Sequence, residues 1–227
     1  MTDIVQNFVH LREEIPADIK IVAVSKSHPS GDIMTLYNAG HKVFGENRVQ
    51  ELLRKKEILP TDIEWHLIGH LQTNKVKAVI PHVKLIHSVD SFKLLSVIDK
   101  EAEKAGLTVE CLLQFHIARE ETKTGFSFHE AEEMLGSEDF LKIKNINITG
   151  VMGIATLTKD MRIVREEFRT LKSYFNILEN KYFSNNLYFR ELSMGMSGDY
   201  RLAIEEGSTI VRIGTLIFGE RDISKNN

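Results

Sequence analysis

The feature of this sequence that most constrains its fold is a regular alternation of short apolar runs with longer amphipathic segments. The apolar runs have the length of β-strands, and the segments between them have the apolar spacing of helices. Strict strand–helix alternation predicts a parallel sheet, because each crossover helix returns the chain to the same end of the sheet. We expect strands at residues 19–25, 42–44, 63–68, 84–88, 107–115, 146–154, 187–192 and 209–213.

The helices expected between these strands cover residues 31–39, 47–59, 72–80, 91–105, 127–135, 159–182 and 200–206, and an extra N-terminal helix covers residues 3–14. Ser30 and Asn47 (or Glu46) are candidate N-caps, and Ser127 has Glu130 in the capping-box position. Pro81 is expected to end its helix. Eight strand–helix units favour closure into a single (β/α)8 TIM barrel over residues 1–227, with an open doubly wound sheet as the alternative.

The composition excludes several classes of protein. A formal net charge of -3 gives no reason to expect nucleic acid as a partner. No apolar run approaches the roughly 20 residues that span a bilayer, and the N-terminus lacks the basic start and apolar core of a signal peptide. The single Cys111 lies in an apolar run, which predicts a buried thiol and suits a reducing compartment. We therefore expect a cytoplasmic protein that is not bound to a membrane.

A lysine stands at the end of the first expected strand. Residues 21–24 are an apolar run, as in a strand that is covered on both faces, and Lys26 follows it. The carboxyl ends of parallel strands are where α/β proteins bind ligands. On position alone, a solvated charge at the end of a strand is the simpler interpretation of Lys26, and the C-terminal part of the chain changes that interpretation.

Two turns near the C-terminus have similar chemistry. The segment SMGMSGD at residues 193–199 precedes a helical run, and Gly214 and Thr215 follow the last strand. Glycine allows close approach of backbone N–H groups to a ligand, and the start of a helix favours anions. We expect Ser197, Gly214 and Thr215 to bind a phosphate through hydroxyl and backbone donors, as the last two units of a TIM barrel often do.

Two other functional interpretations, a serine hydrolase and a metal site, are weaker. The sequence GMSGD resembles the esterase turn G-x-S-x-G, but Asp199 replaces its second glycine, which argues against a serine hydrolase. His66 and His70 have metal-ligand spacing but lack the glutamate of a zincin motif, so no metal site is expected.

Four more residues are candidates for a ligand pocket at the carboxyl ends of the strands. Arg212 alternates with the apolar residues of the last strand, so it points into the barrel if they point outward. Asn47 follows the second strand and is a helix cap, a pocket residue or both. His66 lies on the third strand and could point into the barrel, while Met152 could line the pocket or belong to the barrel core.

Four motifs carry a resemblance to a known family: AVSKSHP at residues 23–29, FGENRVQE at 44–51, WHLIGHLQTNK at 65–75, and ELSMGMSGDYRLAIEEGSTIVRIGTLIFGER at 191–221. A fifth, weaker motif is LLQFHIAREETKTGF at residues 112–126. Together they resemble the pyridoxal phosphate (PLP) homeostasis proteins of the YggS type. That family is similar in fold to the barrel domain of alanine racemase. His116 departs from the small polar residue that is common at its position, which leaves the end of the fifth strand in doubt.

The resemblance implies a role for two residues. It places PLP on Lys26 as a Schiff base, and it places Arg212 against the pyridine nitrogen. An arginine there disfavours a protonated ring, so the ring remains a weak electron sink. The resemblance therefore implies a non-catalytic protein that stores PLP, exchanges weakly with amino acids and delivers the cofactor to apo-enzymes. We expect a monomer or a weak dimer.

Two enzymatic functions remain as alternatives. A PLP-dependent amino-acid racemase needs acid–base groups on both faces of its substrate. In alanine racemase a tyrosine from a second domain serves one of them, and only residues 220–227 follow the IFG segment (residues 217–219) here. An aldolase or isomerase could use Lys26 as a Schiff-base amine for a phosphorylated sugar, and such a protein would be colourless rather than yellow.

Overall fold

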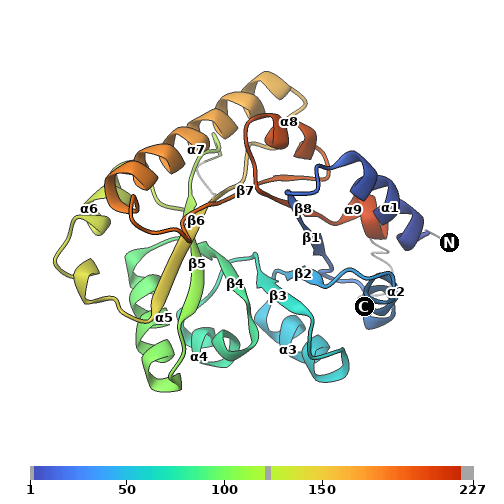
Figure 1. The fold of residues 1–227 in the computed structure, drawn as a ribbon, viewed down its shortest axis with the longest axis horizontal. Helices are drawn as coiled ribbons and strands as arrows, with labels where there is room; N and C mark the ends of the chain where they lie inside the picture. The colour runs from blue at the N-terminus through green and yellow to red at the C-terminus, as the bar shows by residue number, and fades with distance from the viewer. Residues whose placement is uncertain (1–2, 121–123, 221–227) are drawn as a thin grey trace.

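The eight strands close into one barrel in a computed structural model, which describes residues 3–120 and 124–220. The strands pair in sequence order, all neighbouring pairs are parallel, and β1 closes the barrel against β8 (Figure 1). The TIM-barrel fold is therefore confirmed, and the open sheet was the wrong alternative. The strands are β1 (Lys20–Val24), β2 (Val43–Glu46), β3 (Glu64–Leu67), β4 (Leu85–Val89), β5 (Val109–Phe115), β6 (Ile146–Gly153), β7 (Glu191–Met196) and β8 (Ile210–Ile213).

Helices surround the barrel on its outer face (Figure 1). The extra N-terminal helix α1 lies beside the last helix α9, where the side chain of Asn7 donates a 3.1 Å hydrogen bond to the carbonyl of Ile217. No helix in the described part of the chain is long and apolar enough to cross a membrane. The helices are α1 (Ile4–Glu14), α2 (Ser30–Asn38), α3 (Val49–Ile58), α4 (Val76–Val79), α5 (Phe92–Ala105), α6 (Phe128–Leu135), α7 (Met161–Tyr182), α8 (Tyr200–Glu205) and α9 (Thr215–Phe218), with 3₁₀ turns η1 (Thr73–Lys75), η2 (Ile80–His82) and η3 (Phe140–Lys142).

The apolar core has two layers, which explains why the strand sequences are apolar on both faces. The larger layer fills the space between strands and helices. A smaller cluster inside the barrel contains Val22, Leu85, Leu112, Met152 and Ile210. In β1, Val22 belongs to the inner cluster while its neighbour Ala23 belongs to the outer layer, as the alternation of side chains along a strand requires.

One local sequence signal acts as expected. Ser127 and Glu130 form the capping box at the start of α6, with both reciprocal hydrogen bonds present. These bonds satisfy backbone donors that the first turn of a helix leaves without a partner.

Four expectations about boundaries were wrong. The strand expected at residues 187–192 begins later, because Leu187 and Tyr188 are 89% and 65% exposed and lie in the preceding loop. The helix expected at residues 72–80 is broken into η1, α4 and η2, and Pro81 lies within the last turn instead of ending the helix. The cap of α2 is Pro29, with Ser30 already helical. Asn47 does not cap α3, since Arg48 occupies that position.

The fold also contains an element that the sequence pattern did not predict. The short helix α9 begins directly after β8, with Gly214 at its N-cap position. The carbonyl of Gly214 accepts hydrogen bonds of 2.9 Å from the backbone N–H groups of Ile217 and Phe218. Thr215 is thereby the first residue of a helix that starts at the carboxyl end of the barrel.

Candidate functional site

A pocket of about 320 Å³ opens at the carboxyl ends of the strands. Its lining comes from the last two residues of a strand or from the segment that follows one, at β1, β2, β3, β6, β7 and β8. Six of the eight expected site residues meet there: Lys26, Asn47, Ser197, Arg212, Gly214 and Thr215. The lining also contains Val24, His28, Ile68, Ile154, Met196, Gly198 and Gly219.

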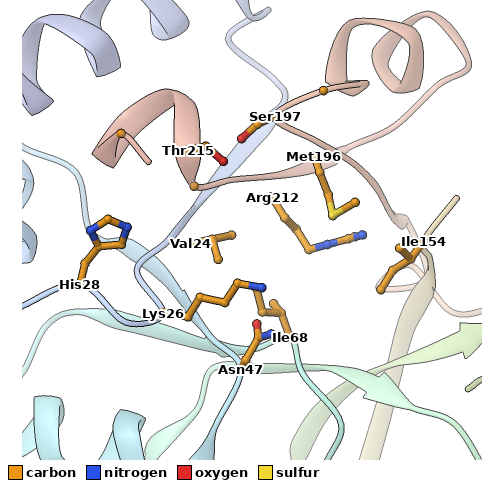
Figure 2. A pocket seen from close by; sticks show the side chains of 13 residues that line it. Val24, Lys26, His28, Asn47, Ile68, Ile154, Met196, Ser197, Arg212 and Thr215 are labelled. Carbon is orange, nitrogen blue, oxygen red and sulfur yellow. The ribbon is translucent and has the colours of Figure 1, made fainter. Parts of the chain in front are cut away.

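Lys26 reaches the pocket from the loop that follows β1. Figure 2 shows its amine directed into the space between Asn47 and Arg212. The loop turns sharply at the next residue, because Ser27 has a φ of 66°, the only positive value of a non-glycine residue in the described part of the chain. Such a conformation is unfavourable for a residue with a Cβ, at about 1–2 kcal/mol, so surrounding contacts must hold it.

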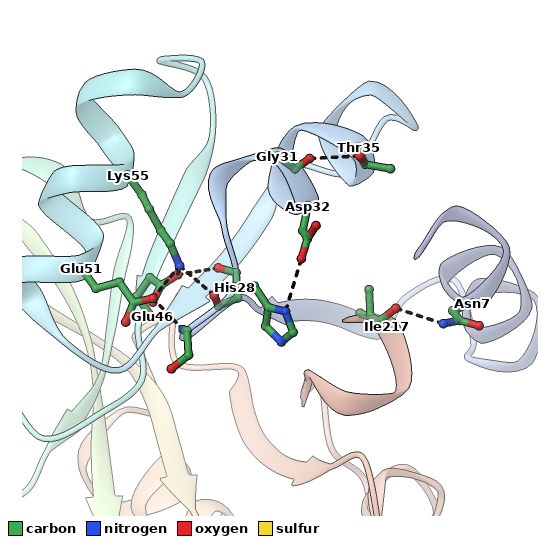
Figure 3. Close-up of polar contacts among 11 residues, drawn as sticks. Asn7, His28, Gly31, Asp32, Thr35, Glu46, Glu51, Lys55 and Ile217 are labelled. Atoms are coloured by element: carbon green, nitrogen blue, oxygen red, sulfur yellow. Dashed lines mark hydrogen bonds and ion pairs between the residues drawn. The ribbon is translucent and has the colours of Figure 1, made fainter. Parts of the chain in front are cut away.

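Lys55 of α3 belongs to a polar network that supplies those contacts (Figure 3). Its amine donates to the carbonyl of Ser25 and to the carboxylates of Glu46 and Glu51, each at 2.7 Å. Glu51 also accepts a 2.6 Å hydrogen bond from the backbone N–H of Ser27. This network fixes the backbone on both sides of Lys26.

The network is buried, which makes it sensitive to substitution. The Glu46 side chain is fully buried, and its other oxygen has no hydrogen-bond partner among the described residues. Burial raises the pKa of Glu46, although the adjacent ammonium of Lys55 favours the carboxylate. The charge of Lys55 is therefore what makes a carboxylate tolerable at this depth.

Two turns place hydroxyl groups on the opposite side of the pocket. Ser197 follows β7, Thr215 begins α9, and Figure 2 shows their hydroxyls directed toward each other. No hydrogen bond within the described residues engages the backbone N–H of Ser197 or Gly198. Together these groups form a set of donors suited to an anion with several oxygen acceptors.

Two glycines allow these turns to form. Gly195 has a φ of 94°, and a Cβ there would lie 2.5 Å from the Cβ of Ala203 in α8. At Gly214, a Cβ would lie 3.1 Å from the carbonyl oxygen of Val24, which is tight against the neighbouring strand β1. The glycines therefore permit α8 to pack on β7 and the end of β8 to approach β1.

Arg212 lies at the floor of the pocket and is 4% exposed. Its guanidinium donates to the Ser193 hydroxyl at 2.6 Å and to the carbonyl of Gly153 at 3.0 Å. Burial lowers the pKa of Arg212 to about 10, partly opposed by Asp199. This value is far above neutral pH, so the pocket contains a fixed cation.

His66 and Met152 do not line this pocket. His66 points into the barrel as expected, but its ring lines a different cavity, at the amino-terminal ends of the strands. Met152 is fully buried in the inner apolar cluster, as its alternative interpretation stated. Both side chains face inward at a level of the barrel that is below the pocket.

Neither of the weaker interpretations gains a structural basis. No hydrogen bond in the described ranges joins Ser197 to a histidine. His70 instead pairs with Asp90 at 2.9 Å, and the described residues contain no group of three or more His, Cys, Asp or Glu side chains arranged for a metal ion. His116 Nε2–H donates a 2.9 Å hydrogen bond to the carbonyl of Glu120, and His116 lies outside the pocket lining.

Sequence reasoning missed the apolar lining and His28. Val24, Ile68 and Ile154 close the pocket as the last residue of a strand or the first residue after one. His28 stacks on Phe218, with ring centroids 4.8 Å apart, and pairs with Asp32 at 3.4 Å. Position at a strand end was the available signal for these residues.

Arg221 and residues 121–123, which belong to the motifs described above, lie outside the described residues.

Comparison with known proteins gives a consistent result. The profile of the family described as alanine racemase, N-terminal domain, matches residues 1–222. The pyridoxal phosphate homeostasis protein of Aquifex aeolicus is 44% identical over 203 residues, which cover 89% of this chain and 87% of that protein. The Escherichia coli K12 protein of the same name is 33% identical over 99% of this chain and 100% of its own.

A solved relative has the same architecture. The structure of PipY from Synechococcus elongatus PCC7942 with PLP bound has a TM-score of 0.87 and 34% identity, and the match covers 96% of this chain and 100% of PipY. This chain therefore belongs to the pyridoxal phosphate homeostasis protein family, which has the fold of the alanine racemase N-terminal domain.

Proposed function

We propose that this member of the family binds PLP in the carboxyl-end pocket, holds it as a Schiff base on Lys26, and serves PLP homeostasis without catalysing a reaction of its own. One observation carries the proposal: a lysine, a fixed cation and two hydroxyl-bearing turns converge on a single pocket. The relatives named for PLP homeostasis and the PLP-bound PipY structure support it.

The donor set of the pocket fits the chemical groups of PLP. Ser197, Gly198 and Thr215 offer hydroxyl and backbone donors for the phosphate, and the amine of Lys26 points into the other side of the pocket, where the aldehyde would lie. Arg212 would donate to the pyridine nitrogen, and Asn47 would lie beside the ring. When bound, PLP supplies an aldehyde that reacts reversibly with amines.

Arg212 is the reason to propose a binding protein in place of an enzyme. Its guanidinium stays charged and can only donate, so it favours a pyridine nitrogen without a proton. A ring in that state is a poor electron sink, which disfavours removal of the α-proton from an amino acid. The residues around the pocket hold and orient the cofactor without promoting carbanion chemistry.

Labelling tests the attachment to Lys26. Freshly purified protein should be yellow, and borohydride reduction followed by peptide mass mapping should place the pyridoxyl group on Lys26. An adduct confined to Lys20, Lys55 or Lys84 would contradict the assignment. A colourless protein that cannot be loaded with PLP would instead favour the aldolase alternative.

Deuterium exchange separates the carrier from the racemase. The protein, loaded with PLP, should exchange the α-proton of alanine and other amino acids far more slowly than the ~1 s⁻¹ or faster turnover of ordinary enzymes. A missing general acid or base alone costs about 10²–10⁴-fold in rate. Exchange at enzymatic rates, with interconversion of enantiomers, would establish a racemase.

The finer parts of the function follow from the same proposal. A carrier must release its cofactor, so we include delivery of PLP to apo-enzymes, with amino acids as weak competitors for the aldehyde. We place the protein in the cytoplasm, since the lone Cys111 is buried and free, and we include a monomer or weak dimer in the same proposal. Transfer of PLP to an apo-aminotransferase, faster than release into buffer, would support direct delivery.

A further inference from the structure

A second cavity lies at the opposite end of the barrel from the PLP pocket. It has a volume of about 190 Å³, and its lining comes from the amino-terminal parts of the strands and the residues just before them, including Lys20, His66, Lys84, Thr149 and Arg190. A single ordered water needs only about 10–15 Å³ of such space. The cavity is therefore large enough for a small ligand.

Two buried polar atoms at this cavity have no partner. His66 is 1% exposed and Thr149 is 5% exposed, and the residues that the structure describes offer no hydrogen bond to His66 Nε2 or to Thr149 Oγ1. Buried polar groups nearly always have a partner, and each exception requires an explanation. Both residues line the cavity, so a ligand there could supply the two missing partners.

The charges at the cavity favour an anion. Its two carboxylates are already paired: Glu110 with Lys84 at 2.7 Å, and Glu191 with Lys20 at 3.5 Å. Glu191 also accepts a 3.0 Å hydrogen bond from the hydroxyl of Thr209. Within the described residues, the guanidinium of Arg190 has no ion-pair partner, which leaves one net positive charge among the lining residues.

A buried hydrogen-bond chain determines what His66 presents to the cavity. Arg212 can only donate, so its 2.6 Å bond makes the Ser193 oxygen an acceptor. Among the described residues, the Ser193 hydroxyl has hydrogen bonds only with Arg212 and His87 Nδ1, so its proton is donated to His87 Nδ1 at 2.9 Å. His87 then carries its own proton on Nε2 and donates it to His66 Nδ1 at 2.9 Å. Burial lowers the pKa of His66 to about 3, so its ring is neutral. Because His66 Nδ1 accepts from His87, the single proton of the His66 ring is on Nε2.

We propose that this cavity is a second binding site, for a small oxyanion such as phosphate or a carboxylate, coupled to the PLP pocket through the chain His66–His87–Ser193–Arg212. The anion accepts from His66 Nε2–H and Thr149 Oγ1–H and pairs with Arg190. All four members of the chain are buried, so their hydrogen bonds strengthen one another.

The coupling follows the hydrogen-bond chain from the anion to Arg212. An anion at His66 Nε2–H makes His66 Nδ1 a stronger acceptor, and the effect passes through His87 and Ser193 to Arg212. Arg212 is the proposed donor to the pyridine nitrogen, so this part rests on the proposed function. By linkage, the anion and PLP must change each other's affinity by the same factor.

Calorimetric titration of inorganic phosphate into PLP-loaded protein tests the site, because bound PLP occupies the other phosphate-binding turns. We expect saturable binding that weakens at least tenfold in Arg190→Gln and in the nearly isosteric Thr149→Val. Lys100→Gln removes an exposed cation outside the cavity and is the matched control, with unchanged affinity. Sodium acetate in a separate titration distinguishes a carboxylate site from a phosphate site.

Several outcomes would overturn the proposal. No saturable binding of either anion, or binding that Arg190→Gln leaves unchanged, means that the cavity contains water only. If the protein binds no PLP, the proposed function fails, but the titration of phosphate into the Ser197→Ala/Thr215→Ala variant still tests the second site. For the coupling, phosphate should shift the absorbance band of bound PLP in the original protein and not in Ser193→Ala, and a band that never moves refutes it.

Discussion

Lys26 owes its position to residues that do not line the pocket. Ser27 adopts a left-handed backbone conformation next to it, and Glu51 and Lys55 bind the backbone on both sides. Strained residues of this kind concentrate at functional sites and persist only where their surroundings impose them. At the scale of single residues, the pocket therefore depends on the buried ion pairs beneath it.

The substitution Lys55→Met tests that dependence. It leaves the carboxylate of Glu46 buried without its cation, and breaking a buried pair in this way costs about 3–5 kcal/mol. We expect the free energy of unfolding in urea to fall by that order and PLP affinity to fall with it. The double variant Glu46→Gln/Lys55→Met removes both charges and should recover much of the stability. A loss below about 1 kcal/mol for the single variant would show that the pair behaves like a surface ion pair.

The two hydroxyls of the phosphate turns should supply much of the PLP affinity. Ser197→Ala/Thr215→Ala removes two donors to a charged group, each worth about 1.5–3 kcal/mol, so affinity should fall at least tenfold. Neither hydroxyl has a hydrogen bond to another described residue, so the melting temperature without PLP should hardly change. Unchanged affinity in a fluorescence titration would mean that the backbone donors alone hold the phosphate.

At the scale of elements, the pocket depends on how β7 and β8 end. The pairing of β7 with β8 changes register between Ser193 and Met196, and Gly195 lies in that interval. A β-bulge of this kind bends a strand and redirects the side chains after it. It brings Ser197 to the pocket while α8 packs closely on the strand.

The substitution Gly195→Ala should therefore damage the site through the packing of an element. The new Cβ would lie 2.5 Å from that of Ala203, and the backbone would remain in a conformation that is unfavourable for alanine. We expect a loss of stability of roughly 1–3 kcal/mol together with weaker PLP binding. Normal PLP affinity in a folded Gly195→Ala protein would show that the turn does not depend on this contact.

Loss of the helix cap of α6 should lower the stability of the fold without changing PLP affinity. Ser127→Ala removes the capping box of α6, which costs about 0.5–2 kcal/mol, and none of α6 lines the pocket. Chemical denaturation should show this loss while PLP affinity stays the same. A change in affinity would indicate that α6 and the pocket are coupled.

At the scale of the whole molecule, three histidines are held neutral by burial. Burial lowers the pKa of His41 to about 4 and that of His66 to about 3, and it lowers the pKa of His87 well below its usual value. The unfolded chain titrates its histidines near pH 6.5. Between pH 6.5 and the lowered values, the unfolded state binds more protons, so stability decreases as the pH falls.

This linkage predicts an acid-sensitive fold. The free energy of unfolding should decrease between pH 6.5 and pH 4, by up to about 1.4 kcal/mol per pH unit for each of these histidines. His41 packs against Phe8 and Phe44, so His41→Phe keeps a ring there and removes one titrating group. Urea titrations at pH 7 and pH 5 should give a smaller difference for His41→Phe than for the original protein, and equal differences would rule out His41 as a contributor.

The sequence alone determined the barrel and most of its candidate pocket. Strand–helix alternation leads to a parallel sheet, and eight units of that length close it. Parallel strands bring their carboxyl ends to one edge, so Lys26, Ser197 and Thr215 could be assigned to one pocket without any knowledge of tertiary contacts. Arg212 could be assigned to the interior because side chains alternate along a strand.

Only the tertiary structure decided the height of each inward side chain along the barrel axis. Alternation tells whether a side chain faces inward, but the tilt and stagger of the closed strands set its level. His66 and Met152 face inward as the pattern predicts, yet they lie below the pocket. The partners of Lys55 and the His66–His87–Ser193 chain join residues up to 106 positions apart in sequence, and such contacts exist only after the barrel closes.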